Sequence, residues 1–346
     1  MILIVRSADT LAENRDLKTE NRNKPMIHDC SKLNTCKRVL VVCGPTATGK
    51  TRLGIELARA LGGEIVSADS MQVYRRMDIG TAKATAAERA AVPHHMLDVA
   101  EPWEDYSVSR YVREASACCD DILARGRLPI LVGGTGLYID SLLSGRDFAA
   151  RQEGDEDLRA ALNAEYDRLG GEAMWETLRG FYPERAAKLH PGDRRRIVRA
   201  IEIYRLTGET ISAHDARTRA LPPRYQARTV ALSFADRADL YARIDRRVEA
   251  MAESGLFEEV EGLLREGLSA DCTAMQAIGY KEAVLALGGE LSRAEAAALI
   301  QQNSRRYAKR QLTWFGRNPE ALWLRWDREP DFGAAVQTAI RHFQGD

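Results

Sequence analysis

Short apolar runs alternate along this chain with stretches in which apolar residues recur every three or four positions. Runs of the first kind predict buried strands, and spacing of the second kind predicts helices with one buried face. Between the strands, 51–62 and 107–125 have helical spacing. Such alternation is typical of a parallel sheet that helices cover on both faces. The predicted strands are 38–43, 64–69, 94–99, 128–132, 228–234 and 321–327.

The middle of the chain has a different pattern. From about residue 146 to 221 the strand signal disappears, and 155–170 and 193–208 are predicted helices that each end at a glycine. A chain of 346 residues also exceeds the size at which a single core usually divides. We therefore predict a helical insertion domain, 146–221, within a core formed by 37–145 and 222–346.

The two ends of the chain differ in character. Residues 1–36 are polar and aperiodic, and they lack the apolar stretch of a secretory signal. We interpret them as a disordered tail or as the result of a start codon assigned too early. Beyond the fifth strand, helices are predicted for 237–253, for 256–266 and for a long segment ending near residue 317. No run approaches about 18 consecutive apolar residues, so we expect no transmembrane helix.

Composition narrows the class of protein only slightly. Lys+Arg and Asp+Glu both number 50, which argues against a basic coat but not against a local basic face. The six cysteines form no CxxC pair and no zinc-spaced cluster, and Cys43, Cys118 and Cys119 lie in apolar segments, where we expect them to fill the core. We expect a reducing, cytoplasmic location and a monomer.

Residues 44–51, GPTATGKT, match the phosphate-binding pattern G-x-x-x-x-G-K-[ST] between a predicted strand and a predicted helix. In such a P-loop, backbone N–H groups at a helix N-terminus surround the phosphates. Lys50 would add a positive charge, and the Thr51 hydroxyl would bind Mg²⁺. We therefore predict a P-loop NTPase-like α/β fold. The motif recognises phosphates rather than a base, so ATP is one candidate ligand among several. The predicted phosphate-binding residues are Gly44, Pro45, Thr46, Ala47, Thr48, Gly49, Lys50 and Thr51.

Two further groups follow predicted strands and are expected to lie near this loop. Asp69 closes the second strand, which commonly neighbours the first in such sheets, and its carboxylate could bind a metal or accept a proton. An N-cap or turn aspartate is the alternative. The sequence GGTG, 133–136, follows the fourth strand and presents the Thr135 hydroxyl at the edge where ligands bind. A plain strand-to-helix turn is the alternative there.

Basic residues gather in two helices. Arg195, Arg196 and Arg199 occupy one face in the insertion, and 301–317 has five Lys/Arg and no acid. Such faces are usually solvated, but they also suit a nucleic-acid backbone. Elsewhere, Arg243 and Arg247 could pair with Asp239 or Glu249, or could reach a diphosphate. The second basic set is Arg305, Arg306, Lys309 and Arg310.

Several blocks in their order along the chain resemble the tRNA dimethylallyltransferase (tRNA isopentenyltransferase) family. The resemblance covers about 38 to 326. The chain lacks the C-terminal Cys–Cys–His–His zinc finger of many eukaryotic members, which favours the bacterial type. The blocks are GPTATGKT, SADSMQVYRRMDIGTAK (67–83), PHHMLDV (93–99), YSVSRYVREA (106–115), LPILVGGTGLY (128–138), RRRIVRAIEIY (194–204), MQAIGYKE (275–282) and RRYAKRQLTWF (305–315).

The resemblance implies transfer of a dimethylallyl group from dimethylallyl diphosphate to the N6 amine of the adenosine 3′ to the anticodon of tRNA. The P-loop would then hold the donor diphosphate with Mg²⁺ and Arg247, and the catalytic residues would be Asp69 as general base, Thr135 and Lys50. Arg195 and Gln276 stand where bacterial members often carry other residues. The implied tRNA-binding residues are Asp69, Ser70, Met71, Gln72, Thr135, Arg159, Arg195, Arg196, Ile197, Val198, Arg199, Gln276, Ala277, Ile278, Gly279, Tyr280 and Lys281.

Two other functions stay open from the residues alone. A P-loop small-molecule kinase would share the loop and Asp69, but it does not account for the two basic helices. A noncatalytic RNA-binding protein with a relic loop would account for those helices and would bind tRNA whether or not Lys50 and Asp69 were intact.

Overall fold

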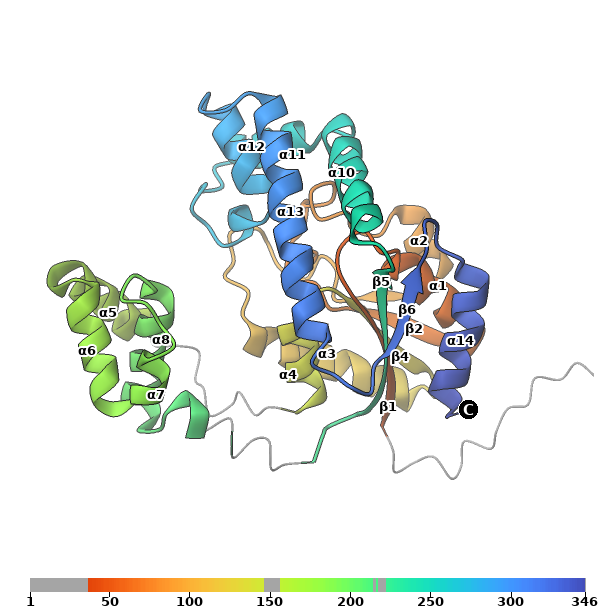
Figure 1. Cartoon of the computed structure of the whole chain (residues 1–346), viewed down its shortest axis with the longest axis horizontal. Coiled ribbons are helices and arrows are strands. Elements are labelled where there is room, and N and C mark those ends of the chain that lie inside the picture. Colours follow the sequence, from red (N-terminus) through yellow and green to blue (C-terminus); the bar gives the residue numbers. More distant parts are fainter. Residues whose placement is uncertain (1–36, 146–155, 214–215, 217–221, 346) are drawn as a thin grey trace, which may run out of the picture. The chain divides into compact units, whose positions relative to one another are not determined.

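The computed structural model describes residues 37–145, 156–213, 216 and 222–345. Its framework is a six-stranded sheet with the order β3-β2-β4-β1-β5-β6, in which every pair is parallel (Figure 1). The strands are β1 (Arg38–Cys43), β2 (Gly63–Ser67), β3 (His94–His95), β4 (Leu128–Gly133), β5 (Gln226–Phe234) and β6 (Leu322–Trp326).

Helices connect the strands and extend beyond them. Those that pack on the sheet or beside it are α1 (Lys50–Leu61), α2 (Ala86–Ala91), α3 (Val108–Ala124), α4 (Gly136–Leu143) and α14 (Phe332–Gln344). The helices between β5 and β6 are α10 (Arg237–Glu253), α11 (Leu256–Arg265), the short 3-10 helix η2 (Ala274–Gln276), α12 (Tyr280–Leu287) and α13 (Arg293–Phe315). Those of the middle segment are α5 (Glu156–Leu169), α6 (Gly171–Phe181), α7 (Pro183–Ala186) and α8 (Arg194–Thr207).

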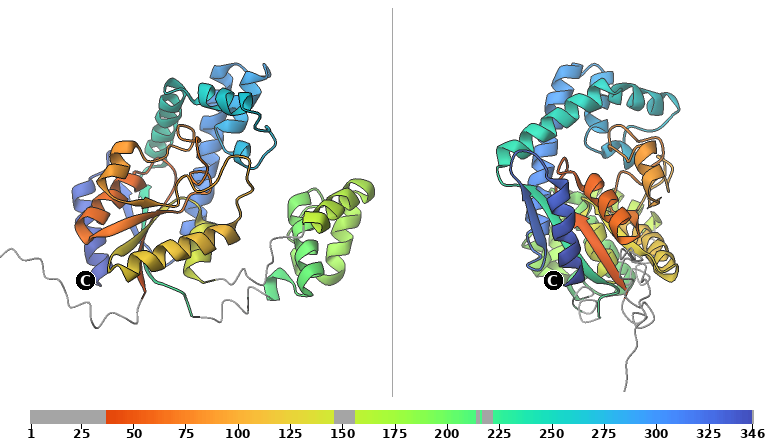
Figure 2. Two further views of the ribbon diagram at one scale, coloured as in Figure 1. Left: turned by 180° about the vertical axis from the view of Figure 1, so that it is seen from behind. Right: turned by 90° about the vertical axis from the view of Figure 1, so that its right-hand side faces the viewer.

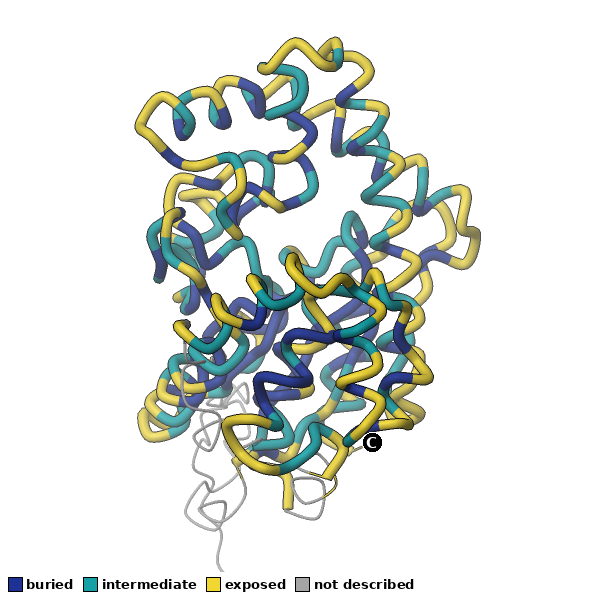
Figure 3. Tube along the Cα trace, turned by 90° about the vertical axis from the view of Figure 1, so that its left-hand side faces the viewer, coloured by how far each residue is buried: buried dark blue, intermediate teal, exposed yellow. Residues whose placement is uncertain are grey.

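The sheet is buried on both faces because its side chains alternate between two apolar layers. Val39 and Val41 of β1 pack in the layer that includes α3 and α4, whereas Leu40 and Val42 pack in the layer with α1 and α14. The two layers can be followed from behind and from the side in Figure 2. Buried positions concentrate in the sheet and on the inward faces of its helices (Figure 3). The predicted α/β fold with a parallel sheet is therefore confirmed.

Two strand predictions need correction. The second strand does not neighbour the first, because β4 lies between them and pairs with both. The predicted strand 94–99 is only two residues long, since Met96 and Asp98 have φ of 63° and 56°, which ends extended pairing. Beyond it, Val99 donates its N–H to the Val73 carbonyl instead.

The segment α5–α8 has a hydrophobic cluster of its own, centred on residues such as Leu162, Met174 and Ile201. At the border of this segment, the Arg224 N–H donates to the Leu143 carbonyl at 3.0 Å. The chain therefore leaves the core and returns to it at adjacent points. This is the arrangement expected of an insertion, although residues 146–155, 214–215 and 217–221 lie outside the described residues, as do 1–36.

No helix in the described part of the chain has the length and apolar character needed to cross a membrane.

Candidate active site

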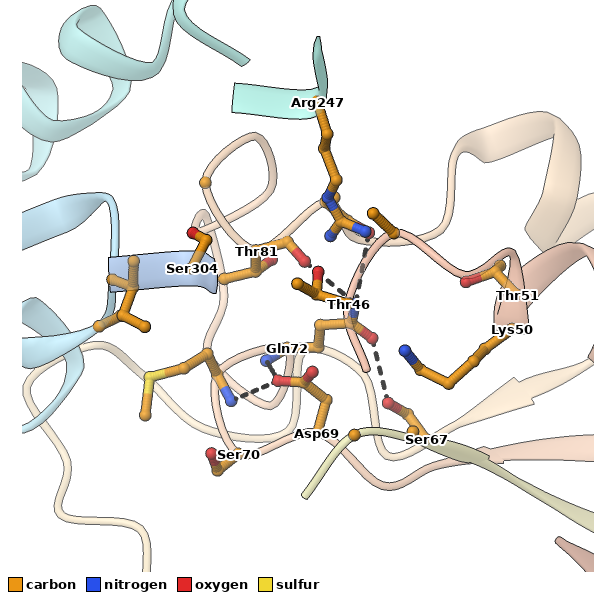
Figure 4. A pocket seen from close by; sticks show the side chains of 18 of the residues that line it. Thr46, Lys50, Thr51, Ser67, Asp69, Ser70, Gln72, Thr81, Arg247 and Ser304 are labelled. Atoms are coloured by element: carbon orange, nitrogen blue, oxygen red, sulfur yellow. Dashed lines mark hydrogen bonds between the residues drawn. The ribbon is translucent and has the colours of Figure 1, made fainter. Parts of the chain in front are cut away.

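A cavity of about 600 Å³ lies at the carboxyl ends of the central strands. Its wall is formed by the P-loop, by the segment that follows β2, by the glycines that follow β4, and by α10, α13 and the segment 276–281. Figure 4 shows the side chains that the P-loop, the segment after β2, α10 and α13 contribute. The register explains why these loops meet, because Cys43 pairs with Gly133 and Ser67 pairs with Val132. The predicted site residues that line the cavity are Thr46, Ala47, Gly49, Lys50, Thr51, Asp69, Ser70, Met71, Gln72, Arg247, Gln276, Ala277, Ile278 and Lys281.

The P-loop is held in shape by its own hydrogen bonds. The buried Thr48 hydroxyl donates to the Pro45 carbonyl at 2.8 Å, and the Lys50 ammonium donates to the same carbonyl at 2.7 Å. Gly44 has a φ of 136°, and a Cβ there would lie 2.4 Å from the Leu232 carbonyl oxygen of β5. Only glycine allows this approach. Gly44, Pro45 and Thr48 thus shape the loop from behind the cavity wall.

Two half-buried cations of the cavity form no ion pair within the described residues, although the charge of Asp69 acts on both. Burial, together with the nearby charge of Arg247, lowers the pKa of Lys50 to about 8. Burial likewise lowers the pKa of Arg247, whose guanidinium makes no hydrogen bond or ion pair within the described residues. Both side chains reach into the cavity, from α1 and α10 (Figure 4). Buried cations cost free energy unless an anion joins them, so this arrangement is suited to a polyanion.

Arg243 neither pairs with the acidic residues of its own helix nor lines the cavity. It bonds neither to Asp239 nor to Glu249. Its Nε donates to the Ala47 carbonyl at 3.2 Å, and its guanidinium pairs with Glu329 at 3.3 Å. Arg243 therefore stabilises the P-loop from outside, while Arg247, one helical turn later, points into the cavity.

The Asp69 carboxylate is oriented by its own turn. One oxygen accepts the N–H groups of Met71 at 2.9 Å and Gln72 at 3.3 Å. This is an Asx-turn geometry. The second oxygen has no hydrogen bond within the described residues. Nearby, the Thr135 hydroxyl accepts the Ser70 N–H at 3.0 Å. Thr135 does not line the cavity, but this bond ties it to the segment that carries Asp69.

Gln72 is more constrained than its predicted role in reading a base would suggest. Its amide nitrogen donates to the carbonyls of Thr81 and Ala82, and its amide oxygen accepts from Ser67 (Figure 4). All of its donors are therefore used within the protein. Gln72 holds the loop 78–82 against the cavity, where Thr81 also contributes to the wall.

Of the residues that α13 places in the cavity, sequence reasoning named Arg310 but missed the uncharged ones. Ser304, Tyr307 and Gln311 line it from one face of that helix. Burial and the charge of Asp69 raise the pKa of Tyr307 to about 12. A usable signal existed in the spacing of these residues, because positions 300, 304, 307 and 311 recur at helical intervals and would share a face.

The third predicted tRNA segment divides between cavity and core. Gln276, Ala277, Ile278 and Lys281 line the cavity. Gly279 and Tyr280 do not. Gly279 has a φ of 103° and its N–H donates to Glu282, while Tyr280 is fully buried with its hydroxyl bonded to Glu259. The Tyr280 side chain is therefore a core residue, and we no longer expect it to contact tRNA.

The predicted tRNA residues of the insertion also have different environments. Ile197 and Val198 are buried in the α5–α8 cluster, so their side chains are not available to a ligand. Arg195 and Arg196 are exposed on α8. The remaining two arginines are held by the fully buried Glu202, which pairs with Arg159 at 3.0 Å and with Arg199 at 2.7 Å.

No group of three or more His, Cys, Asp or Glu side chains that could hold a metal occurs among the described residues. Thr51, the residue predicted to bind Mg²⁺, lines the cavity at the start of α1. The four cysteines that the structure describes are free, with Cys43 and Cys119 buried as predicted and Cys118 only half-buried.

Comparisons with known proteins identify the family. The IPP transferase model matches residues 72–318, and the isopentenyl transferase model matches residues 37–98. A tRNA dimethylallyltransferase 1 from Pelobacter propionicus is 44% identical over 307 residues, covering 89% of this chain and 98% of its own. A tRNA dimethylallyltransferase from Geobacillus thermodenitrificans is 46% identical over 309 residues, covering 89% and 97%.

Solved structures agree with these relatives. The tRNA isopentenylpyrophosphate transferase from Bacillus halodurans matches with a TM-score of 0.66 at 39% identity, covering 89% of this chain and 97% of that one. A eukaryotic dimethylallyltransferase acting on tRNA matches with a TM-score of 0.73 at 29% identity, covering 88% and 77%. This chain, with its P-loop and its cation-lined cavity at the edge of a parallel sheet, belongs to the tRNA dimethylallyltransferase family.

Proposed function

We propose that this enzyme transfers a dimethylallyl group from dimethylallyl diphosphate to the N6 amine of the adenosine 3′ to the anticodon in tRNA. The observation that carries the proposal is the composition of the cavity. A P-loop with two unpaired cations, Lys50 and Arg247, faces a carboxylate, Asp69, whose second oxygen is free within the described residues. The side with the two cations suits a diphosphate. The side with Asp69 suits an amine that gives up a proton.

The donor would bind with its diphosphate on the P-loop. The loop N–H groups, Lys50 and Arg247 would neutralise its charge, and the apolar side chains of Val248 and Met251 on α10 offer a wall for the dimethylallyl group. The donor set also fits Mg²⁺, which prefers a few protein oxygens together with substrate phosphates. Thr51 would hold that ion, which would supply further charge neutralisation to the diphosphate.

The reaction requires one bond to form, one to break and one proton to leave. The adenosine N6 lone pair forms the new bond to the allylic carbon, and the carbon–oxygen bond electrons depart with the diphosphate. Lys50 and Arg247 stabilise that departing charge with positive groups already in position. Asp69 accepts the N6 proton, and the N–H groups of Met71 and Gln72 keep its carboxylate in place for this.

The acceptor base would enter from the side of 276–281 and α13, after leaving its stack in the anticodon loop. Exposed cations on that side suit the RNA backbone. Arg306 and Lys309 are exposed on α13, and Lys281 is exposed where it lines the cavity. Arg195 and Arg196 on α8 offer a second exposed basic face. The comparisons favour neither a small-molecule kinase nor a noncatalytic RNA-binding protein.

The experiment that tests the proposal uses an unmodified tRNA transcript with adenosine 3′ to its anticodon. The protein is incubated with this tRNA, Mg²⁺ and dimethylallyl diphosphate, and the nucleosides are examined by mass spectrometry. We expect one dimethylallyl group on that adenosine and none on a matched transcript with guanosine at the same position. Failure to modify the adenosine transcript, with turnover of ATP instead, would contradict the proposal and favour the kinase.

A further inference from the structure

A single buried side chain bridges the two loops between which the reaction would occur. Gln311 of α13 is 5% exposed, and both ends of its amide are bonded. Its oxygen accepts the N–H of Thr46 in the P-loop at 3.1 Å. Its nitrogen donates to the carbonyl of Gly134, in the turn after β4, at 2.9 Å.

These two bonds join the loops that follow the paired strands β1 and β4. Thr46 lies in the loop that would hold the donor. Gly134 precedes Thr135, whose N–H donates to the Ala68 carbonyl and whose hydroxyl accepts the N–H of Ser70. The turn is therefore continuous, through hydrogen bonds, with the segment that carries Asp69. Gln311 therefore links the diphosphate loop, through a chain of hydrogen bonds, to the segment that carries the proposed base.

The bridge is closely packed against the turn. A Cβ on Gly134 would lie 2.3 Å from the Gln311 amide nitrogen, so a larger residue there would displace the end of the Gln311 side chain. The backbone itself does not demand glycine, because Gly134 has a φ outside the left-handed region. The conflict with a larger residue thus comes from Gln311 alone.

We propose that Gln311 is a positioning residue that fixes the donor loop relative to the acceptor side of the cavity. The inference rests on the proposed function, because it concerns the alignment of the two substrates. Transfer between bound groups requires the reacting atoms at about 3–3.5 Å and aligned, and an error of about 1 Å can lower a rate on the order of 100-fold. A strut that ties both loops to one rigid helix supplies such alignment.

The first test replaces Gln311 by methionine, which keeps the length of the side chain and removes both hydrogen bonds. We expect Gln311→Met to lower the single-turnover rate at least about tenfold, while KM for tRNA and for the donor changes less than about threefold. The matched control is Gln301→Met on the same helix. The amide of Gln301 bonds to α10 at 3.4 Å, away from the cavity, and its loss should leave the rate unchanged.

The second test uses Gly134→Ala, which displaces the Gln311 amide without removing it. We expect a rate loss of the same order, and we expect the double variant Gly134→Ala with Gln311→Met to lose no more than the worse single variant. Each variant is assayed at a temperature at which its circular dichroism and melting curve show that it is folded. Gly134→Ala decides the question in the same way should Gln311→Met not fold.

The outcomes separate this inference from the proposed function. A folded Gln311→Met enzyme with the wild-type single-turnover rate, or losses that simply multiply in the double variant, would overturn the positioning role. No transfer by the wild type and by Gln301→Met alike would contradict the proposed function instead.

Discussion

At the residue scale, the chemistry of the cavity depends on groups whose environments differ from water. Lys50 and Arg247 are held in the cavity with lowered pKa values, and Asp69 stands close enough for its charge to act on both. An anionic donor would reverse the effect of burial on the two cations, because it would favour their protonated forms. The same donor would bring its leaving group beside them.

This leads to a prediction about pH. In the enzyme without donor, burial and the charge of Arg247 lower the pKa of Lys50 to about 8. A bound diphosphate favours the charged form of Lys50. Binding above pH 8 must therefore take up a proton, and donor affinity should fall about tenfold per pH unit there. Calorimetry in buffers of different ionisation enthalpy measures this uptake. The Lys50→Met variant, which cannot take up that proton, should bind more weakly with a flatter pH profile. Equal proton uptake by both proteins would contradict the assignment.

A second prediction concerns Asp69. The Asp69→Asn variant keeps an oxygen that can accept the N–H groups of Met71 and Gln72, but it loses the basic carboxylate. We expect the transfer rate to fall on the order of 100-fold or more, as for loss of a general base, with tRNA affinity retained. Single-turnover kinetics and filter binding measure the two quantities. An unchanged rate would remove Asp69 from the role of base.

At the element scale, α13 combines several tasks in one helix. Its buried face carries Gln311 and Tyr307 into the cavity, and its outer face carries Arg306 and Lys309. Arg305 differs from these exposed cations, because it is half-buried and forms an ion pair with Asp245 of α10. The basic run predicted from sequence therefore divides between a structural ion pair and exposed cations.

The exposed cations can be tested through salt dependence. Reversing the charge at Arg306 and Lys309 should weaken tRNA binding, and the slope of log K against log salt should become shallower by about one for each lost phosphate contact. Arg341→Glu is the control, since that exposed arginine lies on α14 and does not line the cavity. Loss of affinity without a change in slope would indicate that α13 does not contact the phosphates.

At the scale of the whole molecule, the described residues form separate hydrophobic clusters in the core and in the segment α5–α8. The sheet and its helices form two clusters that position the cavity, whereas α5–α8 form a third. Because Leu143 and Arg224 are hydrogen-bonded at the border of the insertion, a short linker should close the core without strain.

The corresponding prediction is a deletion. Replacing residues 146–221 by a short glycine-serine linker should leave a folded core that binds inorganic diphosphate with nearly wild-type affinity. Binding of tRNA should weaken substantially, because the exposed Arg195 and Arg196 are removed. Calorimetry with inorganic diphosphate and filter binding with tRNA measure the two effects. Undiminished tRNA binding by the shortened protein would remove the insertion from that role.

Much of the fold could be predicted because its signals are local. The strand 38–43 and the helix 237–253 were predicted with the bounds that the structure has, since apolar runs and helical spacing are set by neighbouring residues. The helices α2, α4, α6, α7, α12 and α14 were not predicted individually. Of these, α4 begins in the glycine-rich turn, and α14 follows the last strand, where the prediction stopped.

The sequence by itself determined the class of fold, the P-loop, and the presence of Asp69 and Gly133–Gly134 at strand ends, because each depends on a short pattern. Only the tertiary structure decided strand order, which places β4 between β1 and β2. It also decided which residues of the predicted tRNA segments are buried and which face the cavity. Gln311 joins residues 46 and 134 from far along the chain, and a contact between such distant positions exists only once the whole sheet has formed.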